Sequence, residues 1–343
     1  MDAGMQSVRW LFKQLQVDGK WAVRTPGGFR WWPDKYAQTI EVIGQEEDPD
    51  GETDYLVSVR TDVLRSVEPN DNAVAVINIL MSLASMAGPV YDPATRTLSL
   101  CSLVRVHSGI SQWMNWIISV AALLQIGEAR ILAPEMAKIL NAQEAVSGHP
   151  KHGVRPEPDE MVEATSTLIA PLGQEPSRWS AAEFDAVVDN YMNRPPALLA
   201  SGGGPGCTVE FPYGDDSSLC QMAGDRPHPR YGNGLFLLQS FPVVAMSDSD
   251  GARLALSLNE AELRRKPFGY GFGSYTHRNE TIHFVCFLPN IIYRPGLLPN
   301  LYFSCAQRAR EMSIRLKKRD WTPESFRPSR SAIGRLMARF RKR

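Results

Sequence analysis

Hydrophobic positions in this chain follow two periods that alternate along the sequence. Near the start, apolar residues recur at the i, i+3, i+4, i+7 spacing, at Val8, Leu11, Phe12 and Leu15. Runs rich in β-branched and aromatic residues come next, at residues 20–24, 29–32, 37–44 and 55–63. The first pattern predicts a helix with one apolar face, and the second predicts strands. The sequence Asp48-Pro-Asp-Gly51 marks a turn before the fourth strand.

The second half of the chain begins in the same way. After the capping-box pair Ser180 and Glu183, apolar residues return at the helical spacing, at Phe184, Val187, Val188 and Tyr191. Strand-like runs follow at residues 208–213, 235–246 and 252–256. A second helix is predicted in each half, at residues 72–87 and 258–266.

A strand and a helix near the end of each half align without a gap, starting from Tyr91 and Tyr275. Residues 97–104 (TLSLCSLV) match residues 281–288 (TIHFVCFL) at an offset of 184, and each run follows a polar turn. At the same offset, one apolar helical stripe matches another: Met114, Ile117, Ile118 and Ala121 correspond to Leu298, Leu301, Tyr302 and Cys305. The sequence therefore predicts that the two halves superpose.

This order of elements predicts an α+β fold of two similar modules, each an antiparallel sheet with flanking helices in the order α-β-β-β-α-β-β-α. The modules span residues 1–140 and 180–320. Residues 141–179 contain five prolines among acidic and small residues, a composition that is typical of a linker. Residues 321–343 form a separate tail.

The predicted helix at residues 72–87 is apolar almost all round. Its hydrophobic residues are Val74, Val76, Ile77, Ile79, Leu80, Met81, Leu83, Ala84 and Met86. A helix that is covered only by its own sheet would have a polar face. We therefore expect this helix to be buried on both sides, through a contact with the other module or with a second chain.

The composition is that of a folded globular protein, with 43% hydrophobic and 22% charged residues. The net charge is zero but unevenly placed, because residues 315–343 hold eleven basic and two acidic residues and so carry +9, which leaves −9 on residues 1–314. The five cysteines are widely spaced, which predicts reduced core residues. With no leader pattern and no apolar run of membrane length, the sequence predicts a cytoplasmic protein.

The tail is the sharpest local signal. Beyond Pro323 and Pro328, one helical face is apolar, with Ile333, Leu336, Met337 and Phe340, and the remaining positions are basic, with Arg335, Arg339, Arg341, Lys342 and Arg343. This pattern predicts a basic amphipathic helix. Such a helix could dock on a protein, on an anionic membrane surface or on nucleic acid. Alternatively, the tail only increases solubility. We expect the tail to be a separable recruitment element.

Trp31 and Trp32 are a second candidate for binding. Consecutive residues of a strand point to opposite faces of a sheet, so both rings cannot lie in the same core. A helix or the second module could cover the outer ring. Alternatively, the outer ring belongs to a docking surface for a partner, because large aromatic side chains are common interface anchors.

Side chains that carry catalysis or bind metals do not form a recognised constellation. His149 and His152 form an H-x-x-H pair within a proline-rich segment, where we expect a solvated loop. The glycine run at residues 202–206 lacks the Gly-Lys-Ser/Thr of a phosphate-binding loop. In the acidic stretch at residues 46–54, the glycine comes too early for a calcium loop. The sequence predicts no enzyme, no cofactor and no bound metal.

The strand-turn-strand-helix segments and the order of elements resemble the modules of type III secretion chaperones of the CesT kind and of the related YbjN-like bacterial proteins. The resemblance covers residues 5–132 and 180–316. It implies non-enzymatic, acidic, dimeric proteins that hold partner proteins against the outer faces of their sheets. This chain differs by fusing two modules and by carrying a basic tail.

From these observations we expect a chaperone-like or adaptor protein that binds another polypeptide. The alternative is a peripheral membrane or nucleic-acid-associated factor that is recruited by the tail, and no small-molecule substrate is evident.

Overall fold

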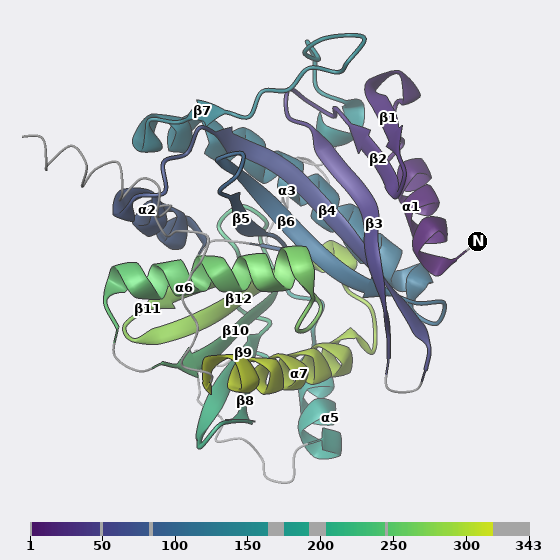
Figure 1. Cartoon of the computed structure of the whole chain (residues 1–343). Helices are drawn as coiled ribbons and strands as arrows, with labels where there is room; N and C mark the ends of the chain where they lie inside the picture. Colours follow the sequence, from purple (N-terminus) through teal and green to yellow (C-terminus); the bar gives the residue numbers. More distant parts are fainter. Residues whose placement is uncertain are drawn as a thin grey trace, which may run out of the picture.

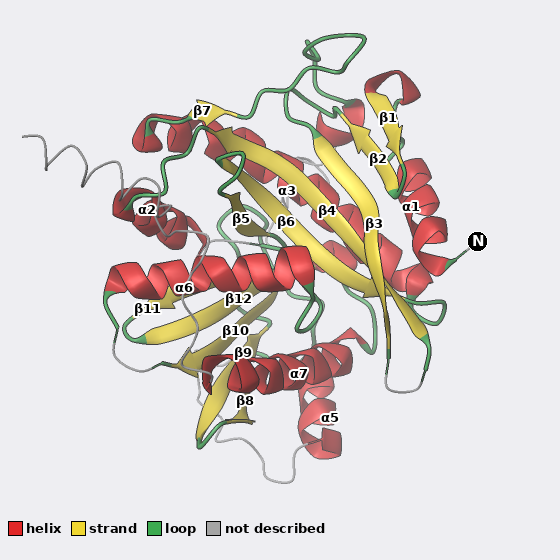
Figure 2. Cartoon of the chain, viewed as in Figure 1, coloured by secondary structure: helices red, strands yellow, loops and turns green. Residues whose placement is uncertain are grey.

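The structure is a computed structural model that describes residues 2–48, 51–81, 85–163, 175–191, 204–243 and 246–317. It is a mixed α+β fold with two antiparallel sheets and flanking helices, as the sequence predicts (Figures 1 and 2). The tail lies outside the described residues, so its predicted helix and binding residues (Ile333, Arg335, Leu336, Met337, Arg339, Phe340 and Arg341) remain a sequence-based prediction.

The first sheet has the strand order β1-β2-β3-β4-β6-β5, and β7 pairs with the end of β4. Its strands are β1 (Ala22–Thr25), β2 (Gly28–Trp31), β3 (Gln38–Glu47), β4 (Thr53–Arg65), β5 (Gly88–Asp92), β6 (Thr97–Val106) and β7 (Gln143–Glu144). The helices of this module are α1 (Ala3–Gln14), α2 (Asp71–Met81) and α3 (Ser111–Leu140). A short 3₁₀ turn, η1 (Gly19–Trp21), precedes β1.

The second sheet has the strand order β11-β12-β10-β9-β8. Its strands are β8 (Gly206–Tyr213), β9 (Asp216–Ala223), β10 (Gly234–Pro242), β11 (Ser274–Arg278) and β12 (Thr281–Pro289). The helical elements are α5 (Ala181–Tyr191), α6 (Asp248–Glu260), the π-helical turn η2 (Ala261–Arg265), the 3₁₀ turn η3 (Asn290–Ile292) and α7 (Leu297–Lys317).

The two sheets share one strand order around their final hairpins. In each, the hairpin strand that precedes the long helix, β6 or β12, lies between its hairpin partner and a long strand, β4 or β10. Residues 97–104 and 281–288 thus occupy equivalent places in their sheets, as the repeat predicts. The gap-free alignment fails inside the hairpins, because Tyr91 pairs with Leu98 whereas Tyr275 pairs with Phe284. The loop between β11 and β12 is two residues shorter.

Local signals account for the helix boundaries. The Asp2 carboxylate accepts a hydrogen bond from the Met5 amide at 2.8 Å and so caps the start of α1. The hydroxyl of Ser247 caps α6 by accepting from the Asp250 amide at 3.1 Å. Helix α3 ends at Leu140. The next residue, Asn141, has a left-handed φ of 48°, which is typical of a helix C-terminus.

Helix α3 spans 30 residues and lies across one face of the first sheet (Figure 1). It is the one helix among the described residues that is long and apolar enough to cross a membrane by length and composition alone, but 72% of its most apolar window is buried inside the protein. The Gln38 side chain donates to the Ala122 carbonyl of this helix at 2.8 Å. Side chains at Trp31, Gln38 and Thr61 therefore point toward α3, and their strand neighbours point away.

The structure corrects the prediction of a strand at residues 252–256. These residues lie in α6, which begins ten residues before the predicted helix start at residue 258. Apart from Arg253 the run is apolar, because α6 is buried on two flanks: Ala252 and Leu256 belong to the cluster around α2, whereas Leu254 and Leu258 belong to the main core. The sequence reading also missed β9, whose alternation is weak because serine and glutamine interrupt it.

Most of the predicted linker is part of the first module. In residues 141–163, β7 pairs with β4, and Val146 forms a bridge with Tyr36. The Asp159 amide donates to the Pro33 carbonyl at 2.7 Å, and Val162 is 4% exposed. These contacts depend on segments that are distant in sequence, so the local composition did not indicate them.

Helix α2 joins the two modules. Its Asn78 side chain bonds to the backbone of edge strand β11, donating to the His277 carbonyl at 2.9 Å and accepting from the His277 amide at 2.7 Å. The predicted contact outside the helix's own module is therefore confirmed. The prediction that the helix is buried on both sides is wrong, because Ile79 is 67% exposed. The second module contacts one flank of α2 and leaves the other open.

Candidate functional site

Trp31 and Trp32 are both buried, at 0% and 3% exposure. Their rings point to opposite faces, as the strand alternation requires. Trp31 donates to the Gln38 side chain at 3.1 Å beneath α3. Trp32 donates to the Ser147 hydroxyl at 3.2 Å and contacts the His149 ring. The segment after β7 covers the outer ring, so neither tryptophan is open to a partner as the docking hypothesis required.

A buried carboxylate on α3 connects the two modules. Glu128 is 3% exposed, and its Oε1 accepts hydrogen bonds from the Ser85 hydroxyl at 2.6 Å and from the Tyr231 hydroxyl of the second module at 3.2 Å. Beside it, the Phe287 amide of β12 donates to the Ser85 carbonyl at 3.0 Å. Burial raises the pKa of the Glu128 carboxyl above its ordinary value of 4.5.

We predict that Glu128 makes the folded state less stable as the pH rises. Because its pKa is higher in the folded chain than in the unfolded chain, the folded chain retains the proton longer. The contribution of the Glu128 proton to the free energy of unfolding is complete below pH 4.5, and it is lost as the pH rises through the folded-state pKa. Glu128→Gln, which remains neutral, should gain free energy of unfolding relative to the unmodified chain as the pH rises toward 8.

Urea unfolding across this pH range measures the difference between the two chains. Glu135→Gln is the matched control on the same helix, because Glu135 is exposed and forms a surface pair with Lys138. A pH dependence that is unchanged by Glu128→Gln would contradict the prediction.

A second buried charge lies inside the second module. The Glu262 carboxylate, from η2, accepts bonds from the Arg308 guanidinium of α7 at 2.8 and 3.2 Å and from the Tyr275 hydroxyl at 2.6 Å. Glu262 and Arg308 are 0% and 1% exposed, and the guanidinium lies 3.6 Å from the centre of the Phe284 ring. The two buried charges therefore neutralise each other within the module.

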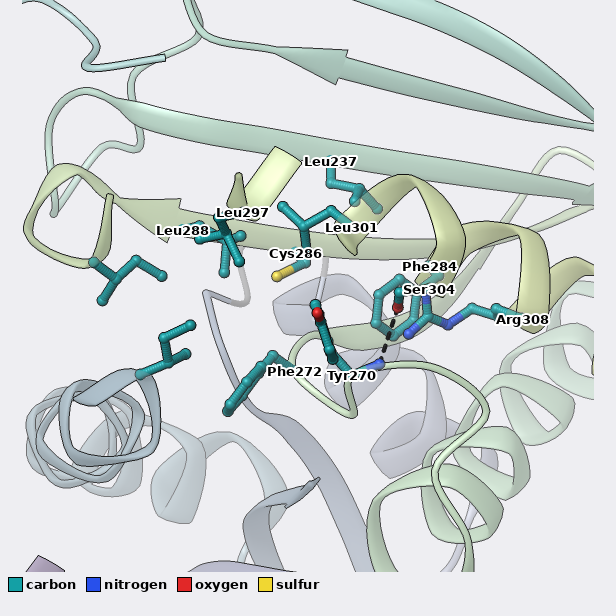
Figure 3. A pocket seen from close by; sticks show the side chains of 12 residues that line it. Leu237, Tyr270, Phe272, Phe284, Cys286, Leu288, Leu297, Leu301, Ser304 and Arg308 are labelled. Carbon is teal, nitrogen blue, oxygen red and sulfur yellow. Dashed lines mark hydrogen bonds between the residues drawn. The ribbon is translucent and has the colours of Figure 1, made fainter. Parts of the chain in front are cut away.

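An apolar cavity adjoins this ion pair (Figure 3). It is lined by Ile117 of α3 together with residues from β10, β12, α7 and the loop before β11, among them Leu237, Tyr270, Cys286, Leu301 and Ser304. The Tyr270 amide donates to the Ser304 hydroxyl at 3.0 Å at its rim. Its volume of about 20 Å³ accommodates about one water molecule.

The histidines and cysteines do not form a metal site among the residues that the structure describes. His149 and His152 stack with ring centres 4.8 Å apart, which places the rings face to face. The solvated-loop expectation is wrong for His149, which is 5% exposed and packs on Trp32. All five cysteines are free and buried, as predicted.

Aromatic rings gather on the surface where α5 meets α7. Tyr191, Tyr302 and Phe303, which we call the aromatic cluster, contact one another at centroid distances of 5.1 to 5.7 Å. Tyr191 is 43% exposed and Phe303 is 52% exposed. The Tyr302 hydroxyl donates to the Tyr191 carbonyl at 3.2 Å, which holds the two helices together at this point.

The face of the first sheet that points away from α3 carries charged residues. Arg30 of β2 pairs in register with Thr39 of β3, which pairs with Arg60 of β4. Asp62 lies two residues beyond Arg60 on the same face, 3.4 Å from the Arg60 guanidinium and 3.7 Å from that of Arg30. Burial lowers the pKa of Arg30, and the charges of Arg60 and Arg65 lower it further, while Asp62 raises it.

The sequence reading missed both buried acids and the arginines on this face. An available signal for the arginines was the alternation of Ser58, Arg60 and Asp62 along β4 with three valines and a threonine, which indicates a sheet with one polar face. An acid that follows a long apolar stretch of a helix, as Glu128 does, signals a buried polar contact but not its partner.

No protein-family model matches the chain, and comparisons with curated proteins and with solved structures give no significant match.

Proposed function

We propose that this chain is a non-enzymatic protein-binding protein of the adaptor or chaperone-like kind, acting in the cytoplasm. The observation that carries the proposal is the aromatic cluster on α5 and α7. Large aromatic side chains that remain exposed supply a rigid apolar contact area, and such residues dominate the binding energy of protein interfaces. The contacts among the three rings fix them in place before a partner arrives, which reduces the entropy lost on binding.

The buried polar groups support the same proposal. Glu128 and the Glu262–Arg308 pair are consumed by internal hydrogen bonds, and the described cavity accommodates about one water molecule. A small-molecule site ordinarily has a concave pocket of about 300–1,000 Å³ with convergent polar groups. The resemblance to secretion chaperones supports a binding role as well, although here the exposed aromatic rings lie on helices.

Affinity purification from the protein's own cells tests this function. We expect one dominant stoichiometric protein to copurify with the tagged full chain. The double variant Tyr191→Ser with Phe303→Ser should lose that protein while keeping the same melting temperature within a few degrees, because both side chains are partly exposed.

Ile139→Ser is the matched control, because Ile139 is an apolar residue that is 56% exposed on α3, outside the aromatic cluster. Recovery of the same partner by the double variant would refute the proposed surface. Recovery of lipid or nucleic acid in place of a protein would refute the adaptor function and favour recruitment through the tail.

A further inference from the structure

The face of the first sheet that points away from α3 carries arginine side chains whose guanidinium groups have only long contacts with a carboxylate. Arg30 and Arg60 flank the carboxylate of Asp62, and the charge of Arg65 acts on Arg30; we call these four residues the arginine cluster. In Figure 1, α3 runs behind β3, β4 and β6, and among the described elements no helix covers the near face of β3 and β4. The Arg30 and Arg60 side chains are 34% and 42% exposed.

Asp62 does not saturate these guanidinium groups. Its shortest contacts with Arg30 and Arg60 are 3.7 and 3.4 Å, longer than the 2.7–2.9 Å that is typical of a charge-assisted hydrogen bond. Asp62 also accepts a hydrogen bond from the Ser99 hydroxyl at 2.8 Å. The Nε of Arg30 is buried and has no hydrogen-bond partner among the described residues. The register also places Glu41, opposite Ser58, on this face, so three guanidinium groups face two carboxylates and leave a local excess of positive charge.

We propose that the arginine cluster binds an acidic segment of another polypeptide through the carboxylates of its Asp or Glu side chains. Arg30 and Arg60 lie two strands apart in one row, so their backbones are about 10 Å apart and can engage two carboxylates of one segment. Each guanidinium presents the planar fork of donors that matches a carboxylate.

The shape of the surface favours a polypeptide over a small anion. The cluster lies on a sheet face and not in a concave pocket, and an isolated anion on such a face would gain few contacts. An acidic segment gains several contacts at once, which raises the effective concentration of its later carboxylates. On β1, Val23 pairs in register with Arg30. Its side chain is 37% exposed and offers an apolar contact to the same segment.

Fluorescence anisotropy of the full chain with a labelled hexaglutamate peptide tests this proposal. At low ionic strength we expect the peptide to bind, its affinity to fall as salt rises, and a labelled hexaglutamine peptide not to bind. The double variant Arg30→Gln with Arg60→Gln should weaken the dissociation constant at least about tenfold. Arg65→Gln alone should weaken it less, and circular dichroism confirms that each variant is folded.

Arg24→Gln is the matched control for loss of charge, because Arg24 is exposed on β1 but pairs with Phe29 and so points to the opposite face. Its affinity should equal that of the unmodified chain. Equal affinity of the Arg30/Arg60 double variant, or the absence of any peptide binding, would overturn the proposal. Displacement by inorganic phosphate at the concentration at which the peptide itself binds would identify a small-oxyanion site and overturn it too. The aromatic cluster takes no part in this experiment, so the outcome is independent of the proposed function.

Discussion

Replacing Arg308 by methionine is expected to lower the free energy of unfolding by about 3–5 kcal/mol, because it leaves the Glu262 carboxylate buried without its counter-charge. Glu262 would keep the Tyr275 hydroxyl and the Gly269 amide as hydrogen-bond donors, which cannot replace a full positive charge. The guanidinium also covers the Phe284 ring at 3.6 Å, so its removal opens space in the core. Urea unfolding followed by circular dichroism measures the change.

Two further variants isolate the cause of this loss. Arg310→Met removes an exposed arginine two residues along α7 and should change stability by less than about 0.5 kcal/mol. The double variant Arg308→Met with Glu262→Leu removes both charges and should recover part of the lost stability, because it avoids burying a charge but leaves the Tyr275 hydroxyl and the Gly269 amide without their acceptor. If the double variant is as unstable as Arg308→Met, the unpaired charge of Glu262 is not the main cause of the loss.

Gly271→Ala is expected to destabilise the junction between the modules by about 2–4 kcal/mol. A Cβ atom at this position would lie 1.7 Å from the Leu103 carbonyl oxygen of β6, so the loop before β11 would have to move away from the first sheet. Gly271 also has a φ of +66°, where side chains other than glycine are strained by about 1–2 kcal/mol. The movement would break the bond from the Leu103 amide to the Gly271 carbonyl, which is 3.3 Å long.

Gly296→Ala separates backbone strain from the clash. Gly296 has a φ of +84°, and a Cβ atom there would have no atom within 4 Å, so this variant should cost only the backbone strain. Hydrogen exchange should show faster exchange of the Leu103 amide in Gly271→Ala but not in Gly296→Ala. Equal losses of stability in the two variants would mean that the close approach to Leu103 does not matter.

The local sequence determined the kinds and order of most elements. Alternation and helical spacing predicted β1 to β4, the equivalent positions of β6 and β12, and the apolar stripes of α1, α3, α5 and α7, because these patterns follow from the geometry of a single strand or helix. The same patterns failed at residues 252–256, since a helix that is buried on two flanks has apolar residues at four of these five positions, as a buried strand can.

What covers each element was decided by the tertiary structure alone. The alternation of Trp31 and Trp32 fixed that their rings face opposite sides, but only the return of residues 147–149 to β2 buries the outer ring. Arg30 and Arg60 are 30 residues apart in sequence and meet through β3, and Glu262 reaches Arg308 across 46 residues. The sequence determined the direction of each side chain because that depends on neighbouring backbone, whereas the partner of a side chain depends on segments that only the folded chain brings together.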